Sequence, residues 1–433
     1  MCTHYASVKS RKRGKLPRII MLRVIEAFSG IGSQAKALER IGADFEVLAT
    51  IDWDINAIIA YDIIHNGPQD LTDYNLLSRG EILARLREYT LSSDGKNPLT
   101  FEQLRMISNE ILKRTLAAIE RTNNLVSITD VKAKDLPSKI DVLTYSFPCQ
   151  DLSICGSWHG NKSGIKREAN NRSGMLWEVE RILKEYKELH KRPPKFLLME
   201  NVSNILSKEH KEDFQTWKDY LEEIGYINQV YTLEASNFGI PQRRHRTFMI
   251  SVYANGNKVK RARVINYFKK NDLEKRSSEH PKQLDDLSLY LRTDYSVQQY
   301  REEADISNPN FTESRKRIYE NNDIVFDGKC AVQDTIKTIT TKQDRHPNSG
   351  LVLYPSHAQG KAPYRNITPR ECFLLMGFDE SDFQTLIDNE FLSKSKVFYS
   401  KEKLIKMAGN SIVVNVLEEV FRQIIEIKEK ILD

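Results

Sequence analysis

Six short apolar runs alternate with longer amphipathic stretches along the first 254 residues, and this rhythm limits what the chain can fold into. Apolar runs of this length are typical of strands buried on both faces, and the stretches between them are typical of helices. The pattern therefore predicts an α/β fold, a doubly wound and mostly parallel sheet covered by helices on both sides. The runs are residues 22–28, 46–52, 141–147, 195–201, 227–235 and 246–252.

Later parts of the chain depart from this rhythm. Thr100 and Gln103 resemble a capping box and are followed by apolar residues at helical spacing, so we expect an inserted helical pair there. From Asn255 the alternation weakens into polar sequence, which predicts a second, smaller domain of mixed or mostly β structure. The last segment is apolar and amphipathic again and should fold back onto the first domain. The predicted division is a first domain of residues 21–254 and 400–433, with the helical insert at 78–122, and a second domain of residues 255–399.

Composition and cysteine usage exclude several classes of protein. Charged residues make up 29% of the 433, and no run approaches eighteen apolar residues, which argues against a disordered chain and a membrane span. The five cysteines are odd in number and none forms a C-x-x-C pair, so neither a disulfide framework nor a structural zinc site fits. We therefore expect a cytoplasmic protein without a metal.

The net charge of +6 is concentrated at the start of the chain. Residues 1–23 contain seven Lys or Arg and no acid, so the other 410 residues sum to −1. We interpret residues 1–20 as a basic, disordered tail, and the alternative is a basic arm that contacts phosphates.

A glycine-containing turn and an acidic strand end together point to an adenosine-containing cofactor. The first apolar run leads into the sequence FSGIG at residues 28–32, and glycines at a strand-to-helix turn let a ligand approach the backbone. The second run ends in Asp52 and Trp53, where a carboxylate can take ribose hydroxyls and an indole can stack on a purine. Each feature alone is a weak signal.

Three more strand ends carry side chains suited to catalysis. Cys149 follows Pro148 after the third run and Glu200 lies at the end of the fourth, so both meet the edge where open α/β sheets bind ligands. Arg244 and Arg246 alternate at the start of the sixth run and can point to one side. A free cysteine or an arginine pair is more often structural, so the constellation matters more than any one member.

With these residues placed, the chain resembles the bacterial DNA (cytosine-5)-methyltransferases of restriction–modification systems. The resemblance runs through the whole length in the family's order, not through one motif. It implies a Rossmann-like domain that uses S-adenosylmethionine. It also implies a target-recognition domain, which lies after the QRRHR block and extends through the RNITPREC block. The blocks are FSGIG (28–32), DW (52–53), SFPCQDLS (146–153), Met175-Leu176, MENV (199–202), QRRHR (242–246), RNITPREC (365–372) and GNSIVV (409–414).

The resemblance assigns a role to each candidate catalytic residue. Cys149 is implied to be the nucleophile that adds to C6 of cytosine, so that C5 can attack the methyl group. Glu200 is implied to share a proton with N3, for which a raised pKa is suited. Arg246 is implied to hold O2 of the base, with Arg244 nearby. Because the target atom is stacked inside a duplex, the base must be flipped out of the DNA.

The implied cofactor contacts include one departure from the family's pattern. The family usually has an acid at the position of Ser127, and we keep this serine as a weak contact because its hydroxyl can still accept a hydrogen bond. The implied cofactor-binding residues are Phe28, Gly30, Gly32, Asp52, Trp53, Ser127, Ile128, Pro148, Leu176, Asn410 and Ser411. The implied residues of the DNA or base pocket are Gln150, Ser153, Asn201 and Gln242.

Three rival interpretations can be weighed against this one. The branch of the family that methylates tRNA is compact and lacks a recognition domain of this length. Non-catalytic relatives lose the cysteine or the acid, and both are present here. Regulators that double as methyltransferases carry an N-terminal helix-turn-helix domain, for which the residues before Leu22 are too few. We therefore expect a monomeric enzyme that acts on double-stranded DNA, with a cognate restriction endonuclease as a candidate functional partner.

Overall fold

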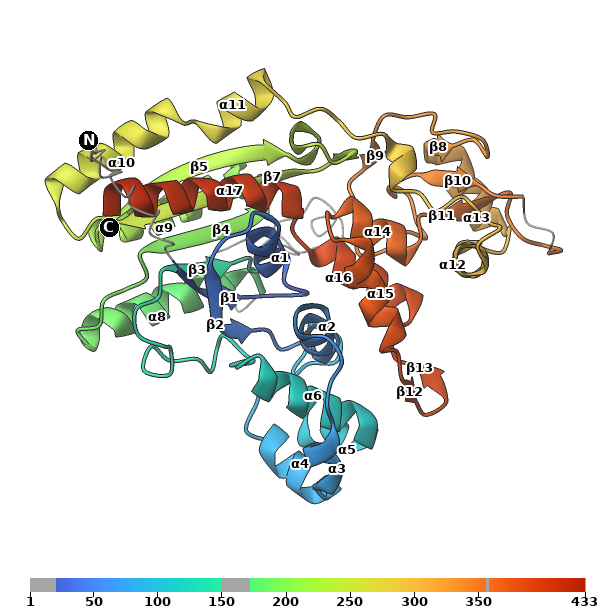
Figure 1. The fold of residues 1–433 in the computed structure, drawn as a ribbon, viewed down its shortest axis with the longest axis horizontal. Coiled ribbons are helices and arrows are strands. Elements are labelled where there is room, and N and C mark those ends of the chain that lie inside the picture. Colours follow the sequence, from blue (N-terminus) through green and yellow to red (C-terminus); the bar gives the residue numbers. More distant parts are fainter. Residues whose placement is uncertain (1–20, 149–171, 356–357, 433) are drawn as a thin grey trace, which may run out of the picture.

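The computed structural model describes residues 21–148, 172–355 and 358–432, and a six-stranded sheet lies at its centre (Figure 1). Its strands are β1 (Leu22–Ala27), β2 (Phe45–Ile51), β3 (Val142–Tyr145), β4 (Phe196–Val202), β5 (Tyr226–Glu234) and β7 (His245–Tyr253). The strand order is β2-β1-β3-β4-β7-β5. β1 pairs in parallel with β2 and β3, and β3 with β4, whereas β7 runs antiparallel to β4 and β5. The sheet is mostly parallel, as predicted, with one reversed strand.

Alternate residues of the central strands contribute to two separate cores. Val24 and Val142 face a core that includes α1 (Ser33–Arg40), α2 (Ile55–Asn66) and α17 (Val414–Ile427). Ile25 and Leu143, their neighbours in sequence, face a core that includes α8 (Leu176–Glu188) and α9 (Lys211–Glu223). Because successive side chains of a strand point to opposite faces, this arrangement buries both sides of the sheet. The doubly wound prediction is confirmed.

The end of the described chain folds back onto the first strands. α17 packs against α1, and Arg40 Nε lies 3.0 Å from Glu418 Oε1. The π-helical turn η5 (Lys428–Leu432) follows, where Lys428 Nζ lies 3.0 Å from the buried Asp141 Oδ2. Lys428 also donates to the backbone oxygen of Met21. These contacts join the last helix to the beginning of the sheet, as the amphipathic pattern predicted.

The insert at 78–122 is helical but contains three helices where a pair was expected. They are α4 (Arg79–Leu86), α5 (Phe101–Met106) and α6 (Asn109–Arg121). Thr100 and Gln103 form the predicted capping box at the start of α5. Apolar residues continue at helical spacing from α5 into α6, but the helix breaks between them. The break arises because Ser108 caps α6, and its side chain accepts a hydrogen bond from Ile111 N–H.

Helices also account for most of the regular structure described in residues 255–399. The helices are α10 (Lys258–Lys270), α11 (Leu273–Glu279), α12 (Gln298–Ser307), α13 (Glu313–Asn321), α14 (Pro369–Leu375) and α15 (Glu380–Asp388). Short strands β8 (Ile324–Phe326), β10 (Leu351–Leu353) and β11 (Tyr364–Asn366) form a small sheet beside them. The region is mixed and not mostly β, because residues such as Asn257 and Asp272 cap helices in its polar sequence.

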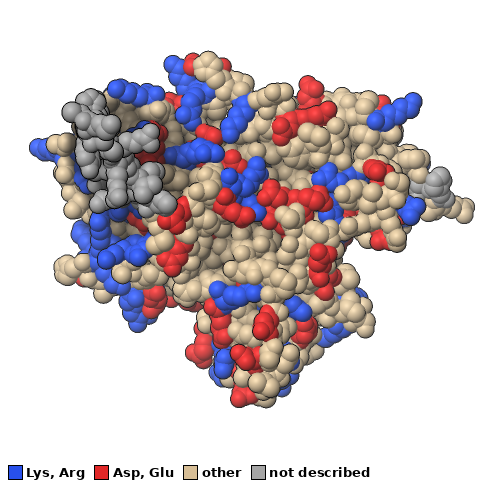
Figure 2. All heavy atoms as spheres, viewed as in Figure 1, with Lys and Arg blue, Asp and Glu red and all other residues tan. Residues whose placement is uncertain are grey.

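The first two of these helices lie beside the central sheet. α10 and α11 pack against β5, and Gln423 Nε2 of α17 donates to the backbone oxygen of Asn271 at 2.6 Å. The predicted boundary at 255 therefore precedes helices that still cover the sheet (Figure 1). On the surface, Lys and Arg side chains gather over α10 (Figure 2). None of the helices in the described ranges is long and apolar enough for a membrane span.

Candidate active site at the carboxyl edge of the sheet

A cavity of about 240 Å³ lies where β1, β2, β3 and β4 end. The start of β7 and the end of α16 (Lys401–Asn410) complete its wall, so segments from both ends of the chain meet there. This is the edge at which doubly wound sheets bind their ligands. The sequence-predicted residues that line it are Phe28, Gly30, Asp52, Trp53, Ser127, Ile128, Pro148, Glu200, Asn201, Arg244, Arg246 and Asn410.

The turn between β1 and α1 brings the backbone to the cavity. Gly30 has a φ of +55°, and a Cβ atom there would meet nothing within 4 Å, so the space above it is open. Gly32 has a φ of +81°, and its Cβ would lie 2.0 Å from His65 Nε2. His65 Nε2 in turn lies 3.0 Å from the backbone oxygen of Ile31. Gly30 therefore leaves room for a ligand, whereas Gly32 lets the turn rest on α2.

Asp52, directly after β2, is oriented by main-chain donors. Its Oδ2 accepts a hydrogen bond from Gly30 N–H at 2.9 Å, and its Oδ1 accepts one from Asp54 N–H at 2.9 Å. Burial raises the pKa of Asp52 to about 6, against the opposing effect of these two bonds. The carboxylate is thus a fixed acceptor at the cavity wall, which suits the ribose hydroxyls of an adenosine-containing cofactor.

Trp53 and Ser127 flank this acceptor. Trp53 is half-buried, and its side chain lines the cavity, so an adenine ring can stack on the indole. Ser127 is buried in the same wall, with its Oγ 2.8 Å from Thr129 Oγ1. An adenosine needs a hydrogen-bond acceptor for its ribose hydroxyls and an aromatic face for its adenine. The residues present supply both, so they fit such a cofactor.

Glu200 stands at the other end of the cavity, near the end of β4. β4 and β7 are antiparallel neighbours with Val202 opposite Arg246, which puts Arg246 on the same face as Glu200. Arg246 Nε lies 3.4 Å from Glu200 Oε1. Burial raises the pKa of Glu200, and the positive charges of Arg246 and Arg244 oppose that shift. The arrangement provides a carboxyl group able to hold a proton beside a guanidinium group.

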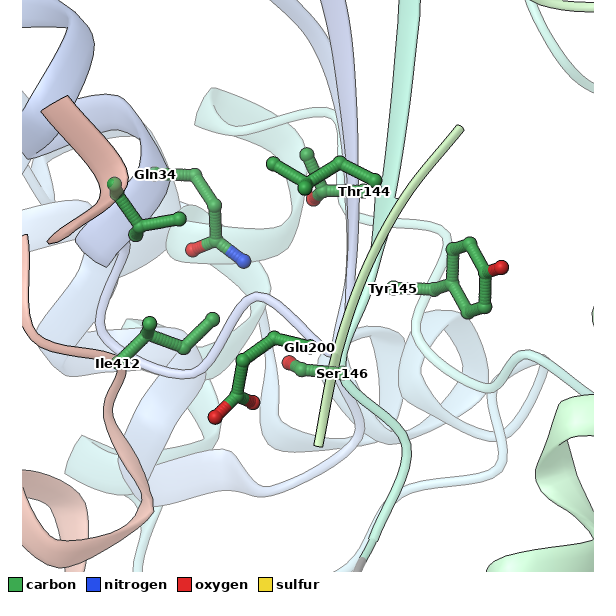
Figure 3. A pocket seen from close by; sticks show the side chains of 8 residues that line it. Gln34, Thr144, Tyr145, Ser146, Glu200 and Ile412 are labelled. Carbon is green, nitrogen blue, oxygen red and sulfur yellow. The ribbon is translucent and has the colours of Figure 1, made fainter. Parts of the chain in front are cut away.

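The Glu200 carboxyl also lines a second, small pocket. Glu200, Gln34 of α1, Ser146 after β3 and Ile412 line this pocket together. Figure 3 shows the Gln34 and Glu200 side chains around this pocket, with Ile412 beside them. Burial of the carboxyl among these side chains is the physical cause of the raised pKa, and it outweighs the two arginines.

Arg244 also lines the cavity, and main-chain oxygens hold its guanidinium group. Its Nη1 donates to Ile339 O at 2.8 Å, and its Nη2 donates to Gly409 O at 3.1 Å and Ser411 O at 2.9 Å. A guanidinium bonded to main-chain oxygens in this way joins β7 to the chain after β9 (Ile336–Lys337) and to the end of α16. Its geometry is that of a positioning residue.

Of the predicted residues that the structure describes, four lie outside the cavity wall. Leu176 is fully buried in the core on the α8 side, and Met175 lines the cavity in its place. Gln242 donates to Leu375 O at 2.8 Å, which fixes its amide away from the cavity. Ser411 donates to Met407 O, and Gly32 lies on the side of the turn that faces His65 of α2.

Cys149, Gln150 and Ser153 lie outside the described residues. On the described side of this gap, Asn201 Nδ2 donates to Phe147 O at 3.0 Å. This bond fixes the end of the β3 segment directly before Pro148 and Cys149.

Asp54, Gly95 and Lys406 are among the residues of the wall that were not singled out from the sequence. Asp54 follows the Asp52-Trp53 pair, and Lys406 lies three positions before the GNSIVV block, so proximity to a motif was the available signal for these two. Gly95 lies in the helical insert, where no motif marks it. Across the described ranges, no group of three or more His, Cys, Asp or Glu is placed to hold a metal ion.

Comparison with known proteins agrees with this geometry. The sequence profile described as "C-5 cytosine-specific DNA methylase" matches residues 103–426. The chain is 34% identical over 409 residues to the orphan methyltransferase M.SssI of Spiroplasma monobiae, covering 93% of this chain and 97% of that protein. It is 31% identical over 406 residues to the Type II methyltransferase M2.ScrFI of Lactococcus lactis subsp. cremoris, covering 93% and 99%.

The fold is shared with solved structures. The Dnmt2 methyltransferase of S. pombe superposes with a TM-score of 0.56 at 17% identity, covering 94% of this chain and 99% of that one. The Rossmann-like fold is thereby confirmed, and the sequence relatives extend the match over nearly the whole chain. The chain belongs to the family of C-5 cytosine-specific DNA methylases, and its activity is that of a DNA cytosine-5 methyltransferase.

Proposed function

We propose that this enzyme methylates one cytosine within a specific sequence of double-stranded DNA, with the cofactor and the flipped base at opposite ends of one cavity. The observation that carries the proposal is that buried Glu200, paired with Arg246, shares a cavity of about 240 Å³ with Asp52 and Trp53. A base held by the first pair and a nucleoside held by the second would lie next to each other.

The cofactor seat is formed by the β1 turn, the β2 end and α16. When bound, S-adenosylmethionine, the methyl donor of this family, supplies an electrophilic methyl group and leaves as S-adenosylhomocysteine. Asp52 accepts hydrogen bonds from the ribose hydroxyls, Trp53 stacks on the adenine and Ser127 contacts its edge. The other residues assigned to this seat are Phe28, Gly30, Ile128, Pro148 and Asn410, and no residue is assigned to a metal.

At the base end, this chain's residues prepare C5 for attack. The Cys149 thiolate forms a bond to C6, and the C5–C6 electron pair becomes available at C5. Glu200 donates its proton toward N3, which prevents negative charge from building on the ring, while Arg246 holds O2. After methyl transfer, a base removes the C5 proton, the C5–C6 double bond reforms and the thiolate leaves C6.

Target recognition is assigned to the part of residues 255–399 beyond α11. α10 and α11 pack on the central sheet, so the later helices and the small β8-β10-β11 sheet are the segments available to contact base edges. Residues 1–20 lie outside the described ranges and stay assigned to a basic tail, with contact to DNA phosphates as the alternative.

We further propose that the enzyme acts as a monomer in the cytoplasm and protects host DNA alongside a cognate restriction endonuclease. The support is that one relative, which aligns with 93% of this chain, is named a Type II methyltransferase. Another relative is named an orphan methyltransferase, so the proposed methyltransferase activity does not depend on the presence of a cognate endonuclease.

Transfer of labelled methyl groups from S-adenosylmethionine to duplex DNA and to tRNA tests the substrate. We expect label in duplex DNA only, and bisulfite sequencing of DNA from an expressing host should show one sequence context. Label in tRNA with none in duplex DNA would contradict the proposal. Methylation of every cytosine irrespective of its neighbours would contradict the assigned recognition region.

A further inference from the structure

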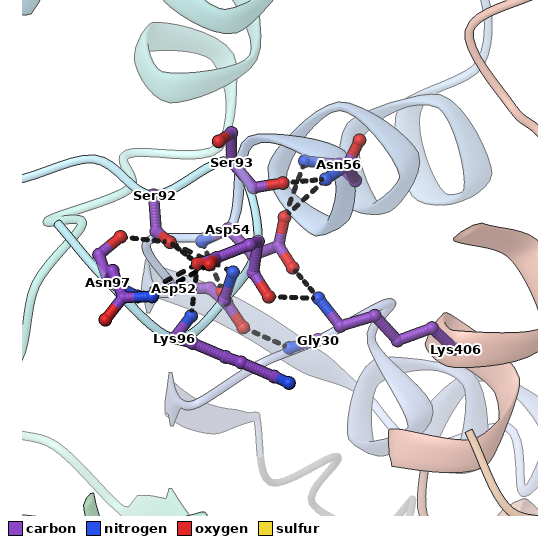
Figure 4. Close-up of polar contacts among 11 residues, drawn as sticks. Gly30, Asp52, Asp54, Asn56, Ser92, Ser93, Lys96, Asn97 and Lys406 are labelled. Carbon is purple, nitrogen blue, oxygen red and sulfur yellow. Dashed lines mark hydrogen bonds and ion pairs between the residues drawn. The ribbon is translucent and has the colours of Figure 1, made fainter. Parts of the chain in front are cut away.

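The helical insert reaches the cofactor end of the cavity through residues 91–97, which we call the insert loop. Its Gly95 lies in the cavity wall together with Asp54 and with Lys406 of α16. Figure 4 shows the loop and the Lys406 side chain converging on Asp54, next to Asp52 and Gly30. The insert is therefore part of the cavity and not only an added surface domain.

Main-chain pairing holds the insert loop against the residues after β2. Ser92 N–H donates to Trp53 O at 2.8 Å, and Ile55 N–H donates to Ser92 O at 2.9 Å. Asn56 Nδ2 donates to Ser93 O at 3.0 Å. The loop thus continues the wall that begins with the predicted ribose and adenine contacts.

Lys406 fastens this wall from the side of α16. Its Nζ lies 2.7 Å from Asp54 Oδ2 and donates to the backbone oxygen of Asp94 at 2.7 Å. The pair is shielded, with 28% of the Lys406 side chain and 13% of the Asp54 side chain exposed. An ammonium group has three N–H donors, so these two bonds leave a third for a ligand in the cavity.

Gly95 allows the three groups to meet. Its φ is +66°, and a Cβ atom there would lie 2.8 Å from Asp54 Oδ2 and 3.0 Å from Lys406 Nζ. Any side chain at this position would push the loop away from the ion pair. Glycine therefore permits the closest approach of the insert to the cavity.

We propose that Lys406 is a cofactor-binding residue and that the insert loop covers the ribose of the cofactor. Asp54 and the Asp94 carbonyl orient the ammonium group, whose remaining N–H donates to a ribose hydroxyl oxygen beside Asp52. This inference rests on the proposed use of S-adenosylmethionine, and it adds a segment and a charge to that seat.

Calorimetric titration of the full chain with S-adenosylhomocysteine tests it. Lys406→Met should raise Kd about tenfold, the usual effect of losing a hydrogen bond to a charged group. Lys406→Arg should recover part of the loss, and KM for the cofactor should rise more than kcat falls. Lys113→Met is the matched control, since Lys113 lies in the insert and bonds Asn75 at 2.8 Å.

Gly95→Ala provides an independent variant. It should also raise Kd, and its effect should be less than additive with Lys406→Met because both act on one contact. An unchanged Kd in a folded Lys406→Met protein would overturn the inference, as would equal losses for Lys406→Met and Lys113→Met. Failure of the wild-type protein to bind S-adenosylhomocysteine would instead contradict the proposed cofactor, which separates the two.

Discussion

Asp52, which is half-buried, and Glu200, which is buried, are carboxyl groups at one edge of one sheet, yet they are held in different ways. Asp52 accepts hydrogen bonds from two backbone N–H groups, at Gly30 and Asp54. Glu200 lies against side chains, with Arg246 Nε 3.4 Å away and the Gln34 amide facing the same pocket. Burial raises both pKa values, and only at Asp52 do backbone donors counter it directly.

This difference separates the two tasks of the cavity. An acceptor fixed by the main chain presents the same geometry with or without a ligand, which suits recognition of a constant cofactor. A carboxyl group whose proton is favoured by burial can instead donate that proton to a substrate. We therefore expect substitutions at the two ends to affect different measured quantities.

The largest effect is expected for Glu200→Gln. The amide keeps the size of the side chain but cannot donate a proton as an acid, so kcat should fall by about 10²–10⁴. Binding of S-adenosylhomocysteine, measured by calorimetry, should be unchanged. A loss of cofactor affinity as large as the loss in kcat would erase the distinction between the two ends.

The pH profile sharpens the same point. Because burial raises the pKa of Glu200, the protonated form persists to higher pH than for an ordinary glutamate. Activity that needs this proton should fall as pH rises through that pKa, and Glu200→Gln should lack this alkaline fall. A profile of kcat/KM for both proteins checks it, and an identical alkaline limb in the variant would assign the proton to another group.

Asp52→Asn should act on binding. Losing the charge that meets the ribose hydroxyls should raise the Kd for S-adenosylhomocysteine about 10- to 100-fold, with a smaller change in kcat at saturating cofactor. Asp44→Asn, at an exposed position directly before β2, is the control and should bind S-adenosylhomocysteine with unchanged Kd. Equal effects on Kd from the two variants would remove Asp52 from the seat.

The two glycines of the β1 turn should separate ligand space from packing. Gly32→Ala places a Cβ against His65 and should lower the free energy of unfolding by about 2–3 kcal/mol through strain and overpacking. Gly30→Ala meets open space, so its cost should be about 1 kcal/mol of backbone strain, while cofactor affinity falls. Denaturant unfolding and calorimetry measure both, and a reversed order would contradict the assignment.

Ser127→Ala should have the smallest effect. A neutral hydroxyl contributes less than a carboxylate, so the Kd for the cofactor should rise only about threefold. Thr129→Val, which removes the hydroxyl that Ser127 contacts, tests whether that contact orients the serine. A rise matching that of Asp52→Asn would mean that the serine fully replaces the family's acid.

The strands and their end residues could be predicted because local pattern determines them. Each of the six apolar runs became a strand, and Asp52 and Glu200 meet at one edge because parallel strands align their ends. The reversal of β7 could not be predicted, since an apolar run reads the same in either direction. Helices such as α10 were missed because their caps, not their apolar content, mark them.

Side-chain roles were predictable only where the backbone alone fixes position. Arg246 reaches the cavity through its register with Val202, as alternation on a strand suggested. Arg244 has the same alternation but donates to main-chain oxygens of residues 95 to 167 positions away. Lys406 and Asp54 are likewise joined across 352 positions, and no local pattern carries such a contact.

Covalent trapping tests the central claim, that one cavity joins a cofactor seat to a base site where Cys149 attacks C6. Duplex DNA with 5-fluorocytosine at the target base should form an adduct that survives denaturation when S-adenosylmethionine is present, because fluorine cannot leave C5 as a cation. Mass spectrometry should place the adduct on the peptide containing Cys149, and Glu200→Gln should slow its formation. An adduct on Cys155, or turnover of the fluorinated DNA without any adduct, would contradict the account.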